Sequence, residues 1–359
     1  MARAVRVHQT GGPDVLTYED VDVPAPGKGE VRIRQHACGI NYIDTYFRTG
    51  LYKAPTLPFI AGNEASGEVL DVGVGDTGFH PGDRAAYTTG LGGYASERIM
   101  PAGRLVKLPD MISYEQGAVL MLKGLTVHYL LHKTFKVGPG QNVLIHAAAG
   151  GIGLLACQWA KSLGANVIGT VGSQAKADLA EANGCDHVIL YNDEDFVAAV
   201  KKITRGELCD VVYDGVGKTT FPGSLDCLKP LGIFVSFGNA SGVVPPFSIG
   251  ELQRRGSLFA TRPTLNDYIA RRRDLLEGAG AHDRDLIGQH HRLALVVGHE
   301  DRGDAEPLDQ LAQFGLHRQP ELGVERIEGL VEEQHVRLQH EHAGDGDPHR
   351  AGHETRLDR

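Results

Sequence analysis

Residues Asn142–Lys161 read N-V-L-I-H-A-A-A-G-G-I-G-L-L-A-C-Q-W-A-K. The first five residues form an apolar run of strand length, a glycine-rich turn follows, and residues 154–161 are typical of a helix. A dinucleotide site requires this order, because glycines let the backbone approach a pyrophosphate and the free N–H groups of the helix start can bind it. A tight turn without a ligand is the alternative reading, so the surrounding sequence has to decide.

The segments around this stretch repeat its rhythm. Between about residues 126 and 262, apolar runs of strand length alternate with segments of helix length, which is typical of βαβ units in a parallel sheet. We expect six strands, at residues 142–146, 166–170, 187–190, 210–213, 233–237 and 258–260, with helices between the first five. This pattern predicts a doubly wound α/β domain that binds a nucleotide.

The end of the second predicted strand indicates which nicotinamide cofactor is bound. An NAD site usually places Asp or Glu about 20 residues after the glycines, where it holds the ribose 2′-hydroxyl. Here no carboxylate precedes Asp178, and Ser173 and Lys176 stand in its place. A hydroxyl and a cation favour the 2′-phosphate of NADPH. The alternative is that Lys176 is an ordinary solvated helix residue.

The first 125 residues follow a different pattern. Residues Glu30–Arg34 alternate between apolar and charged side chains, which predicts a strand with one buried face. Residues 68–73 and 85–87 are further short strands separated by Gly and Pro turns. We therefore expect a compact β-rich barrel or sandwich before the nucleotide domain.

Length and composition limit the class of protein. A chain of 359 residues is long enough for two domains with separate cores. Its five cysteines show no CxxC spacing, and its formal charge of −9 gives no support to nucleic-acid binding. The N-terminus lacks an apolar signal region and no stretch is long and apolar enough to span a membrane, so we expect a cytoplasmic protein.

Several motifs resemble the zinc-free quinone oxidoreductases, the zeta-crystallin-like group of the medium-chain dehydrogenase/reductase superfamily. They are G-I-N-Y-I-D at 39–44, G-N-E-A-S-G at 62–67, K-G-L-T at 123–126 and S-F-G-N at 236–239. The resemblance runs from about residue 3 to about 274. It implies a GroES-like substrate domain at 1–125, a Rossmann NADPH-binding domain at 126–262, and the start of a return to the first domain at 263–274.

The resemblance also implies the site. Zinc enzymes of this superfamily carry a cysteine and a histidine where this chain has Asn41 and Asn63, and neutral amides are poor zinc ligands, so we expect no metal. The catalytic residues implied are Asn41, Tyr46 and Thr126. The cofactor-binding residues implied are Gly150, Gly151, Ile152, Gly153, Gly172, Ser173, Lys176, Tyr191, Phe237, Gly238 and Asn239.

The resemblance implies transfer of reducing equivalents from NADPH to a quinone. Without a Lewis acid, hydride transfer suits acceptors that delocalise the incoming charge, namely quinones and α,β-unsaturated carbonyls. An enoyl reductase and a catalytically impaired NADPH-binding protein are the alternatives. The expected partner is a small quinone or enone rather than nucleic acid or a membrane, and a homodimer is compatible with the superfamily.

Residues after about 273 have another composition. Lysine does not occur after Lys229, and ten of the 17 histidines lie between His282 and His353. A stretch without a sustained apolar face cannot offset the entropy of ordering it. We interpret residues 275–359 as a foreign tail, of the kind that a GC-rich gene read out of frame produces. A genuine fusion tail and a loose metal site at His335, His340 and His342 are the alternatives.

Overall fold

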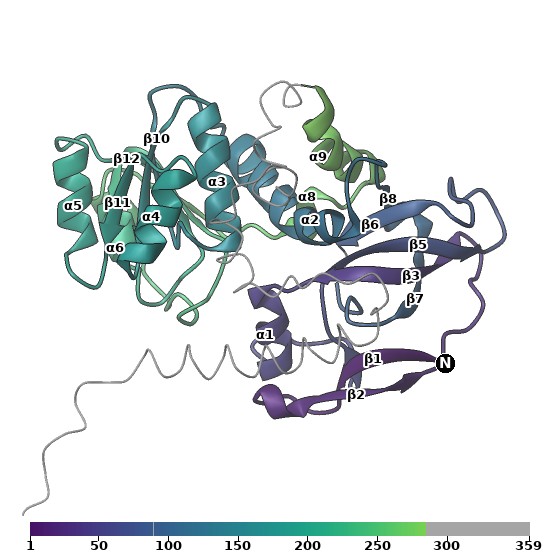
Figure 1. Cartoon of the computed structure of the whole chain (residues 1–359). Helices are drawn as coiled ribbons and strands as arrows, with labels where there is room; N and C mark the ends of the chain where they lie inside the picture. Colours follow the sequence, from purple (N-terminus) through teal and green to yellow (C-terminus); the bar gives the residue numbers. More distant parts are fainter. Residues whose placement is uncertain (89, 285–359) are drawn as a thin grey trace, which may run out of the picture. The chain divides into compact units, whose positions relative to one another are not determined.

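The structure is a computed structural model that describes residues 1–88 and 90–284 (Figure 1). The predicted foreign tail therefore lies outside the described residues from position 285 onward. Among the described residues, the chain forms two compact units. The first consists of residues 1–84 and 90–102, and the second of residues 85–88 and 103–284.

The first unit is built mainly of antiparallel strands. Its elements are β1 (Ala2–Val7), a 3-10 turn (Pro13–Val15), β2 (Leu16–Val21), β3 (Glu30–Gly39), α1 (Tyr42–Thr49), β4 (Phe59–Ile60), β5 (Glu64–Val72) and β7 (Glu97–Pro101). Strand β1 pairs with β2 and β4, and β3 pairs with β5 and β7. Within β3, Val31 and Ile33 are fully buried, so the predicted strand with one buried face is confirmed.

The second unit begins within β6 (Arg84–Thr88), at Ala85; Ala85 and Ala86 pair with β8 (Val106–Lys107). The helices and strands that follow are α2 (Tyr114–Tyr129), a wide turn (Leu130–Thr134), β9 (Asn142–His146), α3 (Gly151–Ser162), β10 (Asn166–Val171), α4 (Gln174–Ala182), β11 (His187–Leu190), α5 (Phe196–Ile203), β12 (Cys209–Asp214), α6 (Gly223–Asp226), β13 (Leu228–Ser236), α7 (Gly250–Arg254), β14 (Phe259–Thr261), α8 (Leu265–Tyr268) and α9 (Arg272–Arg284).

The second unit contains a six-stranded parallel sheet in the order β11-β10-β9-β12-β13-β14. In chain order this is 3-2-1-4-5-6, the doubly wound arrangement expected from the sequence. Helices cover both faces, so the three central residues of β9 are apolar: Val143 and Ile145 share one core with Trp159 of α3, whereas Leu144 packs in the other core with Val200 of α5. Both the fold class and the six predicted strands are confirmed.

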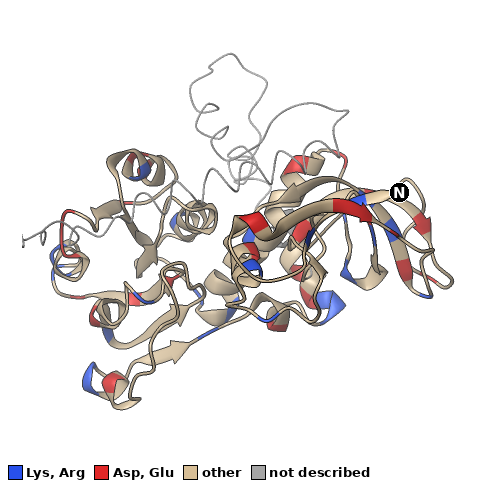
Figure 2. Ribbon diagram, turned by 90° about the horizontal axis from the view of Figure 1, so that it is seen from below, with Lys and Arg blue, Asp and Glu red and all other residues tan. Residues whose placement is uncertain are grey.

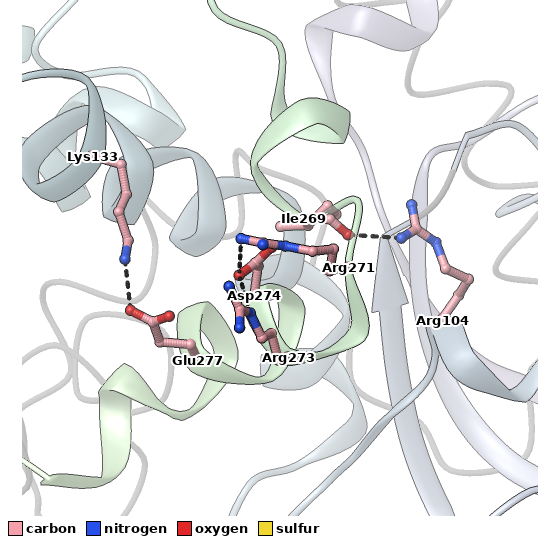
Figure 3. Close-up of polar contacts among 7 residues, drawn as sticks. All are labelled: Arg104, Lys133, Ile269, Arg271, Arg273, Asp274 and Glu277. Carbon is pink, nitrogen blue, oxygen red and sulfur yellow. Dashed lines mark hydrogen bonds and ion pairs between the residues drawn. The ribbon is translucent and has the colours of Figure 1, made fainter.

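The side chains of two arginines bond backbone carbonyls and so attach helices α8 and α9 to the rest of the second unit. Arg104 donates from Nη1 to the carbonyl of Ile269 at 2.8 Å, as Figure 3 shows. In return, Arg272 donates to the carbonyls of Gly103 and Leu105. Leu275 of α9 is fully buried beside Met121 and Leu125 of α2. The first residues assigned to the tail thus pack as part of this unit.

Charges of both signs are interspersed along the described ribbon (Figure 2). The ion pairs among these residues, such as Lys133 with Glu277 and Arg271 with Asp274, are largely solvent-exposed, so each contributes little to stability. Among the described helices, none has the length and apolarity needed to cross a membrane.

Candidate active site

The predicted cofactor residues follow the carboxyl ends of four parallel strands. The glycine turn follows β9, Gly172 and Ser173 follow β10, Tyr191 follows β11, and residues 237–239 follow β13. In a parallel sheet these ends lie at one edge. Strand β9 pairs with β10 on one side and with β12 on the other. The glycine turn therefore lies at the switch point of the sheet, where doubly wound proteins bind their ligands.

The glycine turn forms a cradle that only small residues allow. Ala147 adopts a positive φ of 54°, which turns the chain sharply at the end of β9. A Cβ atom on Gly153 would lie 2.3 Å from the carbonyl oxygen of Ala147, so α3 can start this close to the strand only with glycine there. Gly150 caps α3, and the first turn of this helix carries no acidic residue. The free N–H groups of this turn suit a pyrophosphate.

The end of β10 leaves a hydroxyl and a cation available for a phosphate. Ser173 is the N-cap of α4, but its side chain makes no capping hydrogen bond. Lys176 is exposed and forms no ion pair with the described residues. A Cβ atom on Gly172 would lie 2.7 Å from Oη of Tyr191, and Nδ2 of Asn192 donates to the carbonyl of Gly172 at 2.8 Å. The ends of β10 and β11 are thus held together.

The loop after β13 rests on the loop after β12. The N–H of Phe237 donates to the carbonyl of Asp214 at 2.8 Å. A Cβ atom on Gly238 would lie 2.4 Å from the carbonyl oxygen of Gly215, so the two backbones touch where a side chain would separate them. Asn239 is buried at the end of this contact. The position of Phe237–Asn239 therefore depends on the loop beneath it.

In the first unit, Asn41 and Asn63 belong to a buried polar cluster. Asn41 donates from Nδ2 to Glu64 at 2.9 Å, and Asn63 donates from Nδ2 to Asp44 at 2.5 Å. Asp44 also accepts from the backbone N–H of Asn41 at 2.9 Å and from Oη of Tyr94 at 2.6 Å. Both amides thus direct their N–H groups at carboxylates, and Asp44 joins α1 to two neighbouring segments.

The cluster does not fit a zinc ion. Two neutral amides stand at the ligand positions, and their nitrogen atoms are engaged as donors. Within residues 1–88 and 90–284 there is no group of three or more His, Cys, Asp or Glu side chains that could hold a metal. Burial instead raises the pKa of Asp44 to about 6, with the nearby Glu64 raising it further and the three donors opposing the shift.

The two remaining catalytic candidates lie in different units. Tyr46 of α1 is buried in the first unit, where its ring packs against Tyr42 and Tyr52 with centroids 5.4 Å and 5.0 Å away. Thr126 is buried in α2 of the second unit. The candidate residues therefore divide between the units, with Asn41 and Tyr46 in the first and Thr126 and every cofactor candidate in the second.

A pocket of about 260 Å³ lies within the second unit. Its lining includes Leu125, Tyr129, Lys133, Tyr268 and Glu277, from α2, the turn after it, α8 and α9. None of its lining residues was predicted to bind cofactor or substrate.

Sequence reasoning missed two sets of buried residues. Asp44 follows Asn41 by three residues at the start of a helix, a spacing typical of a capping box that could have revealed it. His146 and Asp214 are polar residues that end apolar strands, yet their burial and their common partner, Ser224, are visible only in the fold.

Two family models match the chain, one in each part. "Alcohol dehydrogenase GroES-like domain" matches residues 27–110, and "Zinc-binding dehydrogenase" matches residues 151–273. Together with the glycine turn at the switch point of the sheet, these matches define the class. The chain has the domain pair of the medium-chain dehydrogenases and reductases.

Similar proteins narrow this class. The chain is 51% identical over 269 residues to a quinone oxidoreductase of Pseudomonas aeruginosa, covering 75% of this chain and 83% of the relative. It is 46% identical over 286 residues to a 2-haloacrylate reductase of a Burkholderia species, covering 78% and 86%. The solved structure of the Escherichia coli quinone oxidoreductase complexed with NADPH matches with a TM-score of 0.80 at 41% identity, covering 92% of this chain and 97% of that one. The chain belongs to the quinone oxidoreductase family.

Proposed function

We propose that this protein is an NADPH:quinone oxidoreductase that works without zinc. The observation that carries the proposal is the edge of the parallel sheet, where a glycine cradle and a helix start lie beside an uncapped serine and an exposed lysine. The quinone oxidoreductase relatives support the same reading. A cytoplasmic location and a homodimer, both expected from the sequence, belong to this proposal and stay predictions.

The residues of the sheet edge have separate tasks in this proposal. Gly150, Gly151, Ile152 and Gly153 bind the pyrophosphate through backbone N–H groups. Gly172, Ser173, Lys176 and Tyr191 hold the adenosine ribose and its 2′-phosphate, because a hydroxyl and a cation follow β10 and no carboxylate precedes Asp178 there. Phe237, Gly238 and Asn239 line the nicotinamide end.

Bound NADPH supplies a hydride, and the acceptor takes it up together with a proton, so that a quinone becomes a hydroquinone. By resemblance we assign Asn41, Tyr46 and Thr126 to the nicotinamide and the substrate. Asn41 is fixed by Glu64 and by the N–H bond to Asp44, and can offer amide hydrogen-bonding capacity but no Lewis acid. The hydroquinone anion that hydride addition leaves can take its one proton from water, so no general acid is assigned.

Cofactor choice gives the first test. We expect NADPH to bind at least about tenfold more tightly than NADH, a difference of roughly 1.4 kcal/mol from the charge-assisted contact to the 2′-phosphate. Lys176→Glu should abolish or reverse this preference, whereas Lys202→Glu, an exposed lysine at the end of α5, should leave it unchanged. Fluorescence titration of both cofactors measures it, and equal affinities in the unaltered protein would contradict the proposal.

A second candidate function is reduction of an α,β-unsaturated carbonyl compound. The similarity to a 2-haloacrylate reductase favours it, and such an acceptor also delocalises the charge of an added hydride. Turnover of 1,4-benzoquinone and of 2-chloroacrylate with NADPH separates the two functions. The proposal requires the larger kcat/KM for the quinone.

A further inference from the structure

A chain of four buried polar side chains runs through the second unit behind the glycine turn. His146, the last residue of β9, lies 2.9 Å from Oγ1 of Thr170 through Nδ1 and 3.1 Å from Oγ of Ser224 through Nε2. Ser224 of α6 in turn donates to Oδ2 of Asp214 at 2.8 Å. All four residues are at most 2% exposed, so these bonds are shielded from water.

The hydrogen bonds of this chain have one consistent direction. Burial lowers the pKa of His146, although the charge of Asp214 opposes the shift, so the ring is neutral with a single N–H. Asp214 at 2.8 Å and the carbonyl of Thr220 at 3.1 Å are both acceptors for the one hydrogen of Ser224, and its oxygen then accepts from Nε2 of His146. Nδ1 then accepts from Thr170. Each donor points along the chain toward the carboxylate.

Asp214 uses its other lone pairs to hold the loop that follows β12. Its Oδ1 accepts from the N–H of Val216 at 2.8 Å and from that of Gly217 at 2.9 Å. Its Oδ2 accepts from Oγ1 of Thr220 at 2.7 Å as well as from Ser224. Four donors satisfy the buried carboxylate, and three of them belong to residues 216–220. The carboxylate thus fixes the shape of this loop.

The loop that Asp214 holds is the support of residues 237–242. The N–H of Ser241 donates to the carbonyl of Val216 at 2.8 Å, and the N–H of Ala240 to that of Gly215 at 3.2 Å. A Cβ atom on Gly217 would lie 2.5 Å from the carbonyl oxygen of Gly242, so the backbones are in direct contact. A shift in the lower loop must therefore be passed to the upper one.

We propose that the chain Thr170–His146–Ser224–Asp214 positions Phe237–Asn239 for the nicotinamide half of the cofactor. Its members are positioning residues, because they act through the two loops rather than by touching the cofactor. The inference rests on the proposed NADPH function and adds to it an asymmetry: the nicotinamide half depends on the buried chain, whereas the adenosine half is held at Gly172, Ser173, Lys176 and Tyr191, after β10 and β11.

The test compares the full-length protein with Ser224→Ala and with the isosteric Thr220→Val, which each remove one donor to Asp214. Affinity is measured for NADPH, which has both halves, and for adenosine 2′,5′-bisphosphate, which lacks the nicotinamide. Both variants should bind NADPH about tenfold more weakly and the bisphosphate within about twofold of the unaltered protein. Thr220→Ser keeps the hydroxyl and should bind NADPH as tightly as the unaltered protein does.

Thr204→Val is the matched control. Thr204 is buried in the same unit. Its hydroxyl donates to the carbonyl of Val200 in α5 and accepts from the N–H of Leu208, the residue before β12. If the control lowers NADPH affinity as much as Ser224→Ala and Thr220→Val do, or if those two variants weaken both ligands equally, the buried chain is only structural and the inference is overturned. Unchanged NADPH affinity in both variants overturns it too. If the unaltered protein binds no NADPH, the proposed function itself fails.

Discussion

At the scale of single residues, Asp44 shows how the first unit treats a buried charge. Its carboxyl group accepts three hydrogen bonds, yet its side chain lies in the interior beside Glu64, and burial raises its pKa to about 6. Folding therefore favours the protonated form. Tyr94, which donates to the carboxyl, has its own pKa raised by the same burial. Burial thus disfavours the ionised form of both Asp44 and Tyr94.

This burial predicts a pH-dependent stability that can be assigned to one residue. The folded state keeps the Asp44 proton up to about pH 6, whereas the unfolded chain releases it near its ordinary value of 3.8. The stabilisation is complete below about pH 4 and is lost as the pH rises to 6. Its size is of the order of 3 kcal/mol, at 1.4 kcal/mol per unit.

Asp44→Asn replaces the titratable carboxyl group with an amide, so it should remove this part of the pH dependence of stability. Urea unfolding between pH 4 and 7.5 measures it as the difference between the unaltered protein and the variant, so that the other carboxylates cancel. The exposed Asp22→Asn variant is the control and should follow the unaltered protein at every pH. If Asp44→Asn and the unaltered protein differ by the same amount across this range, Asp44 ionises normally in the fold.

At the scale of elements, α9 shows that packing continues after the sequence resemblance ends. Leu275 is fully buried against Met121 and Leu125, although the residue after it, Leu276, is 42% exposed. Figure 3 shows Arg104 donating to the carbonyl of Ile269 and Lys133, of the turn after α2, paired with Glu277. Arg272 in turn donates to the carbonyl of Gly103. The start of α9 thus completes a core of the second unit.

The adjacent leucines give a matched test of this packing. Leu275→Ala should lower the free energy of unfolding by about 2–5 kcal/mol, because it leaves a cavity among buried side chains. Leu276→Ala should change it by less than about 1 kcal/mol, because the side chain is partly in water already. Thermal or urea unfolding measures both. Equal, small effects would mean that α9 does not pack in solution as it does here.

Elements with strong periodicity could be predicted from the sequence, and their ends less well. The strand at 142–146 was predicted at its observed bounds because apolar residues stop abruptly at the glycine turn. In contrast, β13 begins at Leu228, five residues before the predicted start, because Lys229, Pro230 and Gly232 interrupt the apolar pattern. Long-range polar contacts such as His146 with Ser224 were not predictable, since no local pattern connects residues 78 positions apart.

At the scale of the whole molecule, two folding units contribute different chemistry. The second unit offers the helix start, the uncapped serine and the lysine of the sheet edge, all of which suit an anionic dinucleotide. The first unit offers a buried cluster in which the amides of Asn41 and Asn63 donate to the carboxylates of Glu64 and Asp44. The family model described as a zinc-binding dehydrogenase matches residues 151–273, whereas both amides lie in the part that matches the GroES-like model.

The amides of this cluster predict the metal content of the full-length protein. Zinc binds thiolate and imidazole far better than amide oxygen, and the nitrogen atoms of Asn41 and Asn63 already donate to Glu64 and Asp44. Elemental analysis of protein purified without chelators should find well under one zinc ion per chain, and NADPH-dependent turnover should survive dialysis against a strong chelator. A zinc-dependent alcohol dehydrogenase treated in parallel should lose its metal and its activity. One tightly bound zinc ion per chain, removed together with turnover, would mean that the cluster around Asp44 rearranges to bind metal and that hydride transfer depends on a Lewis acid after all.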